Sequence, residues 1–140
     1  MSSIIVTKSS DETREFAVKF AAGLKGGEVI ALVGELGAGK TLFVQGLAAG
    51  FHISRKYYVN SPTFTILNIY EGGKMPIYHF DWYRLGSENE CLDIGLEEYF
   101  DGKGVSVIEW ADKFPKLLPE KTVWIKIDVE GEKKRRITVS

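Results

Sequence analysis

The segment GELGAGKT, from Gly34 to Thr41, fits the pattern G-x-x-x-x-G-K-[ST] of a phosphate-binding loop. It follows an apolar run, Glu28 to Gly34, that is typical of a strand buried on both faces of a parallel sheet. From Gly39 to about Phe51 the apolar residues recur at helical spacing. In this context of strand, glycine-rich loop and helix, backbone N–H groups at the helix N-terminus bind phosphate oxygens. The segment therefore predicts a nucleotide site.

Two side chains of this loop are suited to nucleotide chemistry. Lys40 would neutralise charge on the β- and γ-phosphates, and the hydroxyl of Thr41 would be a magnesium ligand. No asparagine of the chain is followed by lysine, so the guanine-reading sequence N-K-x-D is missing, which favours ATP over GTP. The loop residues that we expect to contact the nucleotide are Gly37, Ala38, Gly39, Lys40, Thr41 and Leu42.

A second ligand for the metal is expected at the end of another apolar strand. Glu109 directly follows the apolar residues of VSVIEW, which begins at Val105. A glutamate at this position can bind magnesium directly or through water, or can orient an attacking water. The alternative is a solvent-exposed glutamate at a strand end, in which case Asp112 is the substitute ligand.

Asp81 lies among aromatic residues in YHFDWYRL, three residues before Arg84. A carboxylate in such an apolar run is costly unless it is hydrogen-bonded, paired or functional. The sequence leaves two roles open, one in orienting or deprotonating a nucleophile and one as a structural partner of Arg84. His79 has no second His or Cys nearby and is not expected to bind metal, and Cys91 is interpreted as structural.

Three further features, the segment NSPTFT, Trp110 and the cluster KKRR, each have two possible interpretations. The segment NSPTFT presents the hydroxyls of Ser61, Thr63 and Thr65, and it either approaches the γ-phosphate or is a turn that enters a strand. Trp110 packs either near the nucleotide or in the core. The basic cluster KKRR is either a solvated turn and strand edge or a contact to RNA phosphates within an assembly. Its residues are Lys133, Lys134, Arg135 and Arg136.

The remaining elements complete an α/β pattern. An acidic SSDET segment suits the start of a helix at Ser9 or Ser10, and KGG at Lys25 to Gly27 is expected to end it. The other predicted elements are a β-hairpin of residues 63–70 and 75–83, a helical region at 87–100 interrupted near Gly95, and strands at 122–129 and 135–139. The predicted fold is a P-loop NTPase-like sheet flanked by helices, with added antiparallel strands.

Composition narrows the class of protein. The chain has 140 residues, which is a usual length for a single domain, so we expect residues 1–140 to form one P-loop ATPase domain. The net charge of -1 argues against binding nucleic acid through the domain as a whole. No apolar run approaches the ~20 residues that span a bilayer, and the N-terminus lacks the pattern of a secretory signal. With a single cysteine, the chain suits a reducing cytoplasm, so we expect a cytoplasmic protein that does not bind membranes.

Taken together, these motifs resemble the bacterial TsaE family, the small ATPases of tRNA threonylcarbamoyladenosine biosynthesis. The segments GELGAGKT, SPTFT, YHFDWYRL and IEW occur in the family's order and spacing, and the resemblance spans roughly Ser10 to Asp128. The combination of SPTFT with HFDWYRL is far more specific than the phosphate loop alone.

The resemblance implies an ATPase that binds ATP and Mg²⁺, turns over weakly by itself and acts with TsaD and TsaB. These partners would install the threonylcarbamoyl group on the adenosine next to the tRNA anticodon, so that this chain contacts tRNA at most through the complex. Two alternatives remain, a free-standing small-molecule kinase and a nucleotide-gated binding module. No arginine-rich lid of the kind that kinases use follows the phosphate loop.

The family pattern also implies roles for individual residues. Thr41 and Glu109 would hold magnesium, and Lys40 would bind phosphate. Asp81 matches an aspartate important for activity, and Thr63 matches a switch-like threonine. The segment that flanks the nucleotide in relatives corresponds here to Ser10 or Thr13.

Overall fold

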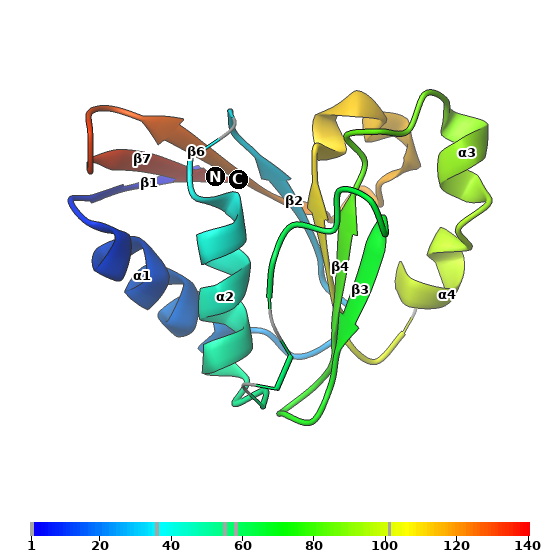
Figure 1. Cartoon of the computed structure of the whole chain (residues 1–140), viewed down its shortest axis with the longest axis horizontal. Coiled ribbons are helices and arrows are strands. Elements are labelled where there is room, and N and C mark those ends of the chain that lie inside the picture. The colour runs from blue at the N-terminus through cyan, green and yellow to red at the C-terminus, as the bar shows by residue number, and fades with distance from the viewer. Residues whose placement is uncertain (1, 36, 55, 58, 101) are drawn as a thin grey trace.

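The computed structural model describes residues 2–35, 37–54, 56–57, 59–100 and 102–140 (Figure 1). Within these residues, a seven-stranded sheet has the order β1-β7-β6-β2-β5-β4-β3. The strands are β1 (Ser3–Thr7), β2 (Val29–Val33), β3 (Leu67–Tyr70), β4 (Ile77–Asp81), β5 (Val105–Glu109), β6 (Val123–Val129) and β7 (Arg135–Val139). The helices are α1 (Ser10–Ala22), α2 (Lys40–Gly50), α3 (Glu88–Leu92) and α4 (Leu96–Phe100), and two short 3-10 turns are η1 (Ala111–Lys113) and η2 (Pro115–Leu117).

The centre of the sheet is parallel and its margins are antiparallel. Strand β2 pairs in parallel with β5 and β6, and β5 pairs in parallel with β4. Strand β3 is antiparallel to β4 at one margin, and β7 is antiparallel to both β6 and β1 at the other. This arrangement confirms the predicted α/β class with added antiparallel strands, including the predicted hairpin.

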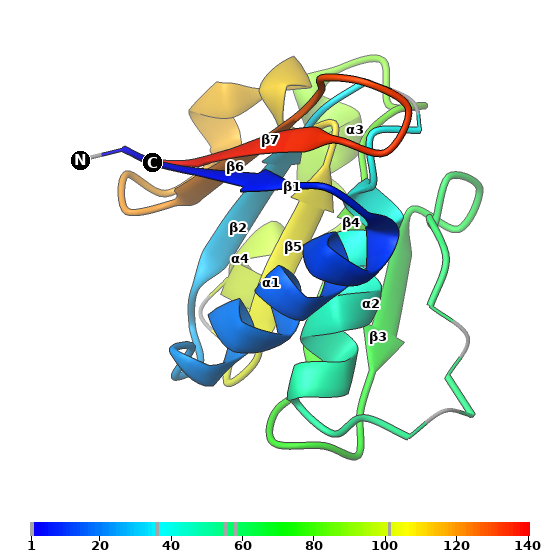
Figure 2. The same ribbon diagram turned by 90° about the vertical axis from the view of Figure 1, so that its left-hand side faces the viewer.

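Helices cover both faces of the sheet (Figures 1 and 2). Helices α1 and α2 lie side by side on one face, and α3 and α4 lie on the other. Along β2, Ile30 and Leu32 belong to the core beneath α1 and α2, whereas Val29 and Ala31 belong to the opposite core. Burial on both faces explains why this strand lacks polar alternation. None of the helices in the described residues has the length and apolar character that crossing a bilayer requires.

Several element boundaries differ from the sequence-based expectation. The start of α1 agrees with the expectation, since Ser9 is the N-cap and its hydroxyl accepts the N–H of Glu12 at 3.1 Å. The helix ends at Ala22, with Gly23 as its C-cap, rather than at the KGG segment. Strand β3 begins only at Leu67, not at Thr63. The intervening residues form a turn that is closed by a 2.7 Å hydrogen bond from Ile66 N to the Pro62 carbonyl.

Two further differences concern the end of β4 and the presence of β1. Strand β4 ends at Asp81 rather than at Tyr83, so Asp81 lies at the carboxyl end of a parallel strand. Strand β1 was not predicted from the sequence. It is a short edge strand whose side chains are mostly exposed, so it lacks the apolar run that marks the buried strands.

Gly46 is expected to be essential for the close packing of α1 on α2. A Cβ atom at this position would lie 2.5 Å from the Ala17 Cβ and 2.7 Å from the Arg14 carbonyl oxygen. Gly46→Ala should therefore lower the free energy of unfolding by about 1–3 kcal/mol, because overpacking outweighs the ~0.5–1 kcal/mol by which alanine favours a helix. Urea unfolding measures the change. Gly23→Ala is the control, since its Cβ would approach only the Phe20 carbonyl oxygen, at 3.8 Å. Equal stability of Gly46→Ala and the parent chain would contradict the expectation.

Candidate active site

The phosphate loop connects β2 to α2 and leaves the N-terminus of that helix open. Gly37 (φ 83°) and Gly39 (φ 112°) adopt left-handed backbone conformations that favour glycine. Gly39 is the N-cap of α2 and provides no side chain to cap the helix. The first helical hydrogen bond runs from Phe43 N to Gly39 O at 3.0 Å, so the preceding N–H groups are available to an anion.

Lys40 lies in the first turn of α2 and is only 5% exposed. Its ammonium group donates to the Gly34 carbonyl oxygen at 2.7 Å and lies 3.9 Å from the ring centroid of Trp110. Burial lowers the pKa of Lys40, and the negative charges of Glu109, Asp81 and Asp112 partly oppose that shift. Lys40 is therefore a cation with little solvent around it, which is suited to binding a phosphate that replaces its present contacts.

Trp110 lies at the edge of the cleft beside Lys40 rather than wholly in the core. Its backbone is left-handed (φ 61°), which is unusual for a bulky residue and turns the chain directly after Glu109. The indole also packs against the Tyr83 ring, with 5.0 Å between centroids. Of the two positions open from the sequence, the structure favours the one near the phosphate loop.

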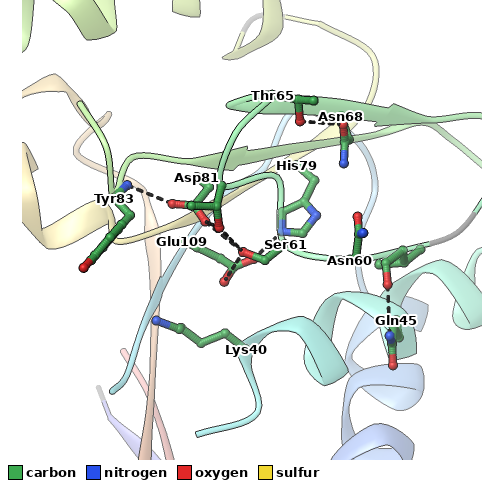
Figure 3. A network of polar contacts seen from close by, with 12 residues as sticks. Lys40, Gln45, Asn60, Ser61, Thr65, Asn68, His79, Asp81, Tyr83 and Glu109 are labelled. Atoms are coloured by element: carbon green, nitrogen blue, oxygen red, sulfur yellow. Dashed lines mark hydrogen bonds and ion pairs between the residues drawn. The ribbon is translucent and has the colours of Figure 1, made fainter. Parts of the chain in front are cut away.

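The two predicted carboxylates are brought together by the register of β4 and β5. Asp81 and Glu109 are paired across these parallel strands and are 1% and 2% exposed. Ser61 lies between them, with its hydroxyl 2.8 Å from Asp81 Oδ2 and 3.4 Å from Glu109 Oε1 (Figure 3). The structure therefore does not support the alternative of a solvent-exposed Glu109. Asp112, the substitute ligand, is exposed in η1.

The remaining partners of Asp81 are also hydrogen-bond donors. The Thr63 hydroxyl donates to Oδ2 at 3.1 Å, and the Tyr83 N–H donates to Oδ1 at 2.8 Å. The guanidinium of Arg84 instead lies 4.8 Å from the ring centroid of Phe64, and no ion pair with Asp81 occurs within the described residues. The structural partners of Asp81 are thus the hydroxyls of the SPT segment (Ser61 to Thr63) rather than Arg84.

His79 contributes to the site, although sequence reasoning set it aside. Its ring is fully buried, with Nε2 2.6 Å from Glu109 Oε2 and Nδ1 2.9 Å from the Tyr70 hydroxyl. The signal that could have identified it is its spacing, because residues two apart on a strand share a face and His79 precedes Asp81 by two.

Most of the predicted residues border one cleft of about 460 Å³, within the usual size of small-molecule sites. The cleft residues are Gly37, Gly39, Lys40, Thr41, Leu42, Ser61, Thr63, Asp81, Tyr83, Glu109 and Trp110. Ala38 and Thr13 instead border a smaller hollow of about 110 Å³, which also includes Ser10, Lys133 and Arg135. Thr13 is buried and its hydroxyl lies 2.6 Å from that of Thr7.

The basic cluster divides into residues with different environments. Arg135 donates through Nε to the Ala38 carbonyl oxygen at 3.0 Å and thus supports the phosphate loop, a contact that sequence reasoning missed. Arg136 pairs with Glu130 at 2.6 Å, and Lys133 and Lys134 are exposed.

Cys91 is buried in the core beneath α3 and α4, and burial raises the pKa of its thiol to about 12, in keeping with a structural role.

Comparison with known proteins supplies the family. The family model described as Threonylcarbamoyl adenosine biosynthesis protein TsaE matches residues 7–137. The chain belongs to the TsaE family. A relative from Bacillus subtilis, described as tRNA threonylcarbamoyladenosine biosynthesis protein TsaE, is 46% identical over 132 residues, which are 94% of this chain and 81% of the relative. A TsaE protein from Treponema pallidum is 42% identical over 135 residues, which are 96% of this chain and 98% of that protein.

A solved structure agrees with the TsaE assignment. The crystal structure of Bacillus subtilis YdiB superposes with a TM-score of 0.85 at 39% sequence identity, covering 99% of this chain and 84% of YdiB. Similarity of this extent covers the whole sheet and the phosphate loop of this TsaE-family chain.

The oxygen donors of the cleft fit a magnesium ion that is held jointly with a nucleotide. Within the described residues, no group of three or more His, Cys, Asp or Glu side chains could hold a metal ion by itself. Mg²⁺ usually binds through one or two carboxylates together with substrate phosphates and water, rather than in an all-protein cage. The Thr41 hydroxyl and the Glu109 carboxylate, which border the same cleft as the open helix N-terminus, match that donor set.

Proposed function

We propose that this TsaE-family chain is an ATPase that binds ATP and Mg²⁺ and acts with TsaD and TsaB in threonylcarbamoyladenosine modification of tRNA next to the anticodon. The observation that carries the proposal is the convergence of Lys40, the open N-terminus of α2 and the Asp81–Glu109 pair on one cleft. Membership of the TsaE family supports the role in tRNA modification, and the side chains of the cleft support the binding and hydrolysis of ATP.

The phosphate loop would bind the nucleotide through its backbone. The N–H groups at the start of α2 point a partial positive charge at the phosphates, and Lys40 adds a full charge once its ammonium leaves the Gly34 carbonyl. The neighbouring hollow beside Thr13 would accept a further part of the nucleotide.

Thr41 and Glu109 would hold Mg²⁺ against the phosphates. A magnesium ion held by these residues would supply positive charge that offsets the negative charge of the phosphates during hydrolysis. Glu109 contributes a carboxylate whose Oε2 is already held by His79, and Thr41 contributes a hydroxyl from the first turn of α2.

Asp81 would act on the attacking water, with Thr63 beside it as the switch-like threonine. Asp81 lies next to Glu109 and could orient the water or accept its proton. In the structure Ser61 and Thr63 occupy its Oδ2 atom, so the SPT segment must release that oxygen before a water can use it. This geometry supports a chain that turns over weakly alone, with partners that favour the released segment.

The chain would work as one component of a larger assembly. We propose that residues 1–140 form one P-loop ATPase domain in the cytoplasm, with tRNA contacted at most through TsaD and TsaB. Lys133, Lys134 and Arg136 are the exposed residues of the basic cluster, and of these Arg136 is paired with Glu130.

Single-turnover hydrolysis with and without TsaD and TsaB tests the proposal. Radiolabelled γ-phosphate from ATP should be released as inorganic phosphate, slowly by the chain alone and faster with both partners. Label on a small acceptor molecule would instead identify a kinase. Nucleotide binding without any phosphate release in the full complex would identify a nucleotide-gated binding module.

A further inference from the structure

A row of three buried polar side chains runs from the core to the cleft. Tyr70 on β3, His79 on β4 and Glu109 on β5 are 3%, 0% and 2% exposed. The Tyr70 hydroxyl lies 2.9 Å from His79 Nδ1, and His79 Nε2 lies 2.6 Å from Glu109 Oε2. Only the far carboxylate oxygen of Glu109 remains for the cleft.

The direction of each hydrogen bond follows from its partners. A carboxylate accepts hydrogen bonds, so His79 Nε2 carries a proton and donates it to Glu109. In the neutral ring Nδ1 is then an acceptor. The single proton of the Tyr70 hydroxyl goes to Nδ1 at 2.9 Å rather than to the Asn60 carbonyl oxygen, which lies 3.4 Å away. Burial raises the pKa of Tyr70, so its hydroxyl retains the proton that this bond requires.

The two oxygens of Glu109 therefore have different environments. Oε2 is fixed by the short contact with His79, whereas Oε1 has a longer contact, 3.4 Å, with the hydroxyl of Ser61. Ser61 has a single proton, and its shorter contact, at 2.8 Å, is with Asp81. Oε1 is thus oriented toward the cleft and only weakly engaged.

We propose that His79 is the positioning residue of Glu109 and that Tyr70 in turn fixes the tautomer and orientation of the His79 ring. This inference rests on the proposed function, since it assigns to His79 the task of presenting Glu109 Oε1 to the magnesium of a bound nucleotide. Partners of this kind behind a metal ligand typically change metal affinity or activity by about 10–100-fold when they are removed.

Two amide substitutions separate this role from a purely structural one. The amide nitrogen of glutamine is as many bonds from Cα as His79 Nε2, so His79→Gln retains a donor directed at Glu109. The amide of asparagine corresponds to Nδ1, so His79→Asn retains a partner for Tyr70 and loses the donor to Glu109. Both variants place an amide at the same buried position.

Calorimetry of ADP binding at increasing Mg²⁺ concentration gives the first readout. His79→Asn should raise the Mg²⁺ concentration for half-maximal enhancement of binding by about 10–100-fold and leave Mg²⁺-free ADP binding unchanged. His79→Gln should remain close to the parent chain, and Tyr70→Phe should fall between the two. Tyr78→Phe and Ser106→Ala are matched controls, because Tyr78 packs on Tyr99 on the opposite face and the buried Ser106 hydroxyl has no partner among the described residues.

NMR of the nucleotide-free chain gives a second readout that is independent of activity. The His79 Nε2–H proton, held by a short bond to a carboxylate, should resonate far downfield, and Glu109→Gln should move it upfield. Tyr70→Phe should perturb the same resonance even if the His79 variants do not fold. A downfield signal that persists unchanged in Glu109→Gln would overturn the assignment of the pair.

The outcomes distinguish this inference from the proposed function. If Mg²⁺ does not affect ADP binding to the parent chain, the magnesium site of the proposed function fails and the role of His79 fails with it. If Mg²⁺ does matter and Glu109→Ala abolishes its effect, but His79→Asn and Tyr70→Phe keep the parent's Mg²⁺ requirement, only the positioning role is overturned.

Discussion

Replacing Lys40 with alanine should weaken ATP binding by about 2–5 kcal/mol, which is about 30-fold or more in Kd. Lys40 is a buried cation at the N-terminus of α2, and a phosphate would replace its present contacts with the Gly34 carbonyl and the Trp110 ring. Without the charge, the phosphates retain only backbone donors. Calorimetric titration with ATP and Mg²⁺ measures the loss.

Two controls accompany the Lys40 variant. Lys126→Ala removes a lysine that is 61% exposed on β6 and should leave ATP affinity unchanged. Lys40→Met keeps most of the side-chain volume under Trp110 and should lose affinity as Lys40→Ala does. A folded Lys40→Ala protein with unchanged ATP affinity would show that the nucleotide binds elsewhere.

The pKa of Lys40 predicts how the parent chain responds to pH. Because burial lowers this pKa, Lys40 loses its proton at a lower pH than an exposed lysine does. The ATP affinity of the parent chain should therefore fall as the pH rises through the lowered pKa. Lys40→Met has no proton to lose and should lack this part of the pH dependence.

Replacing Asp81 with asparagine should reduce ATP hydrolysis with TsaD and TsaB by a factor on the order of 100, the scale of a lost general base. Stability should change little, because the Tyr83 N–H can still donate to the amide oxygen and the hydroxyls of Ser61 and Thr63 can accept from the amide nitrogen. Phosphate release in the full complex, ATP affinity and the melting temperature are the measurements.

The Asp81→Ala variant provides the comparison. Alanine leaves three donors of a buried cluster without their acceptor, so it should destabilise the fold by about 1–3 kcal/mol as well as slow hydrolysis. If Asp81→Asn hydrolyses ATP normally in the complex but melts several degrees lower, Asp81 is a structural residue that holds the SPT segment.

Contiguous motifs allowed the sequence to predict much of the fold. The phosphate loop could be recognised because its strand, glycines, lysine and helix lie within Glu28 to Phe51, where local backbone preferences and apolar spacing are sufficient. The apolar runs that became β2 and β5 predicted strands buried on both faces, and the structure confirms both. The edge strand β1 was missed because its pairing with β7 leaves no such pattern in its own residues.

Tertiary contacts overrode the local strand propensity of residues 63–66, at the end of the SPT segment. Residues 63–66 read as the start of a strand, since they are rich in threonine and apolar side chains. In the structure Thr63 donates to Asp81, Ile66 adopts a left-handed backbone (φ 71°), and the chain turns before β3 begins. The Asp81 carboxylate that Thr63 contacts in this conformation lies 18 residues further along the chain.

By itself, the sequence determined the α/β class, the phosphate loop and the candidate carboxylates Asp81 and Glu109, because each depends on neighbouring residues. Only the tertiary structure decided which groups meet: Ser61 with Asp81, 20 residues apart, His79 with Glu109, 30 residues apart, and Arg135 with Ala38, 97 residues apart. These contacts depend on strand order and register, which bring the carboxyl ends of β4 and β5 side by side. Local preferences do not encode that order, since it is set by how the helices and strands bury their apolar faces against one another.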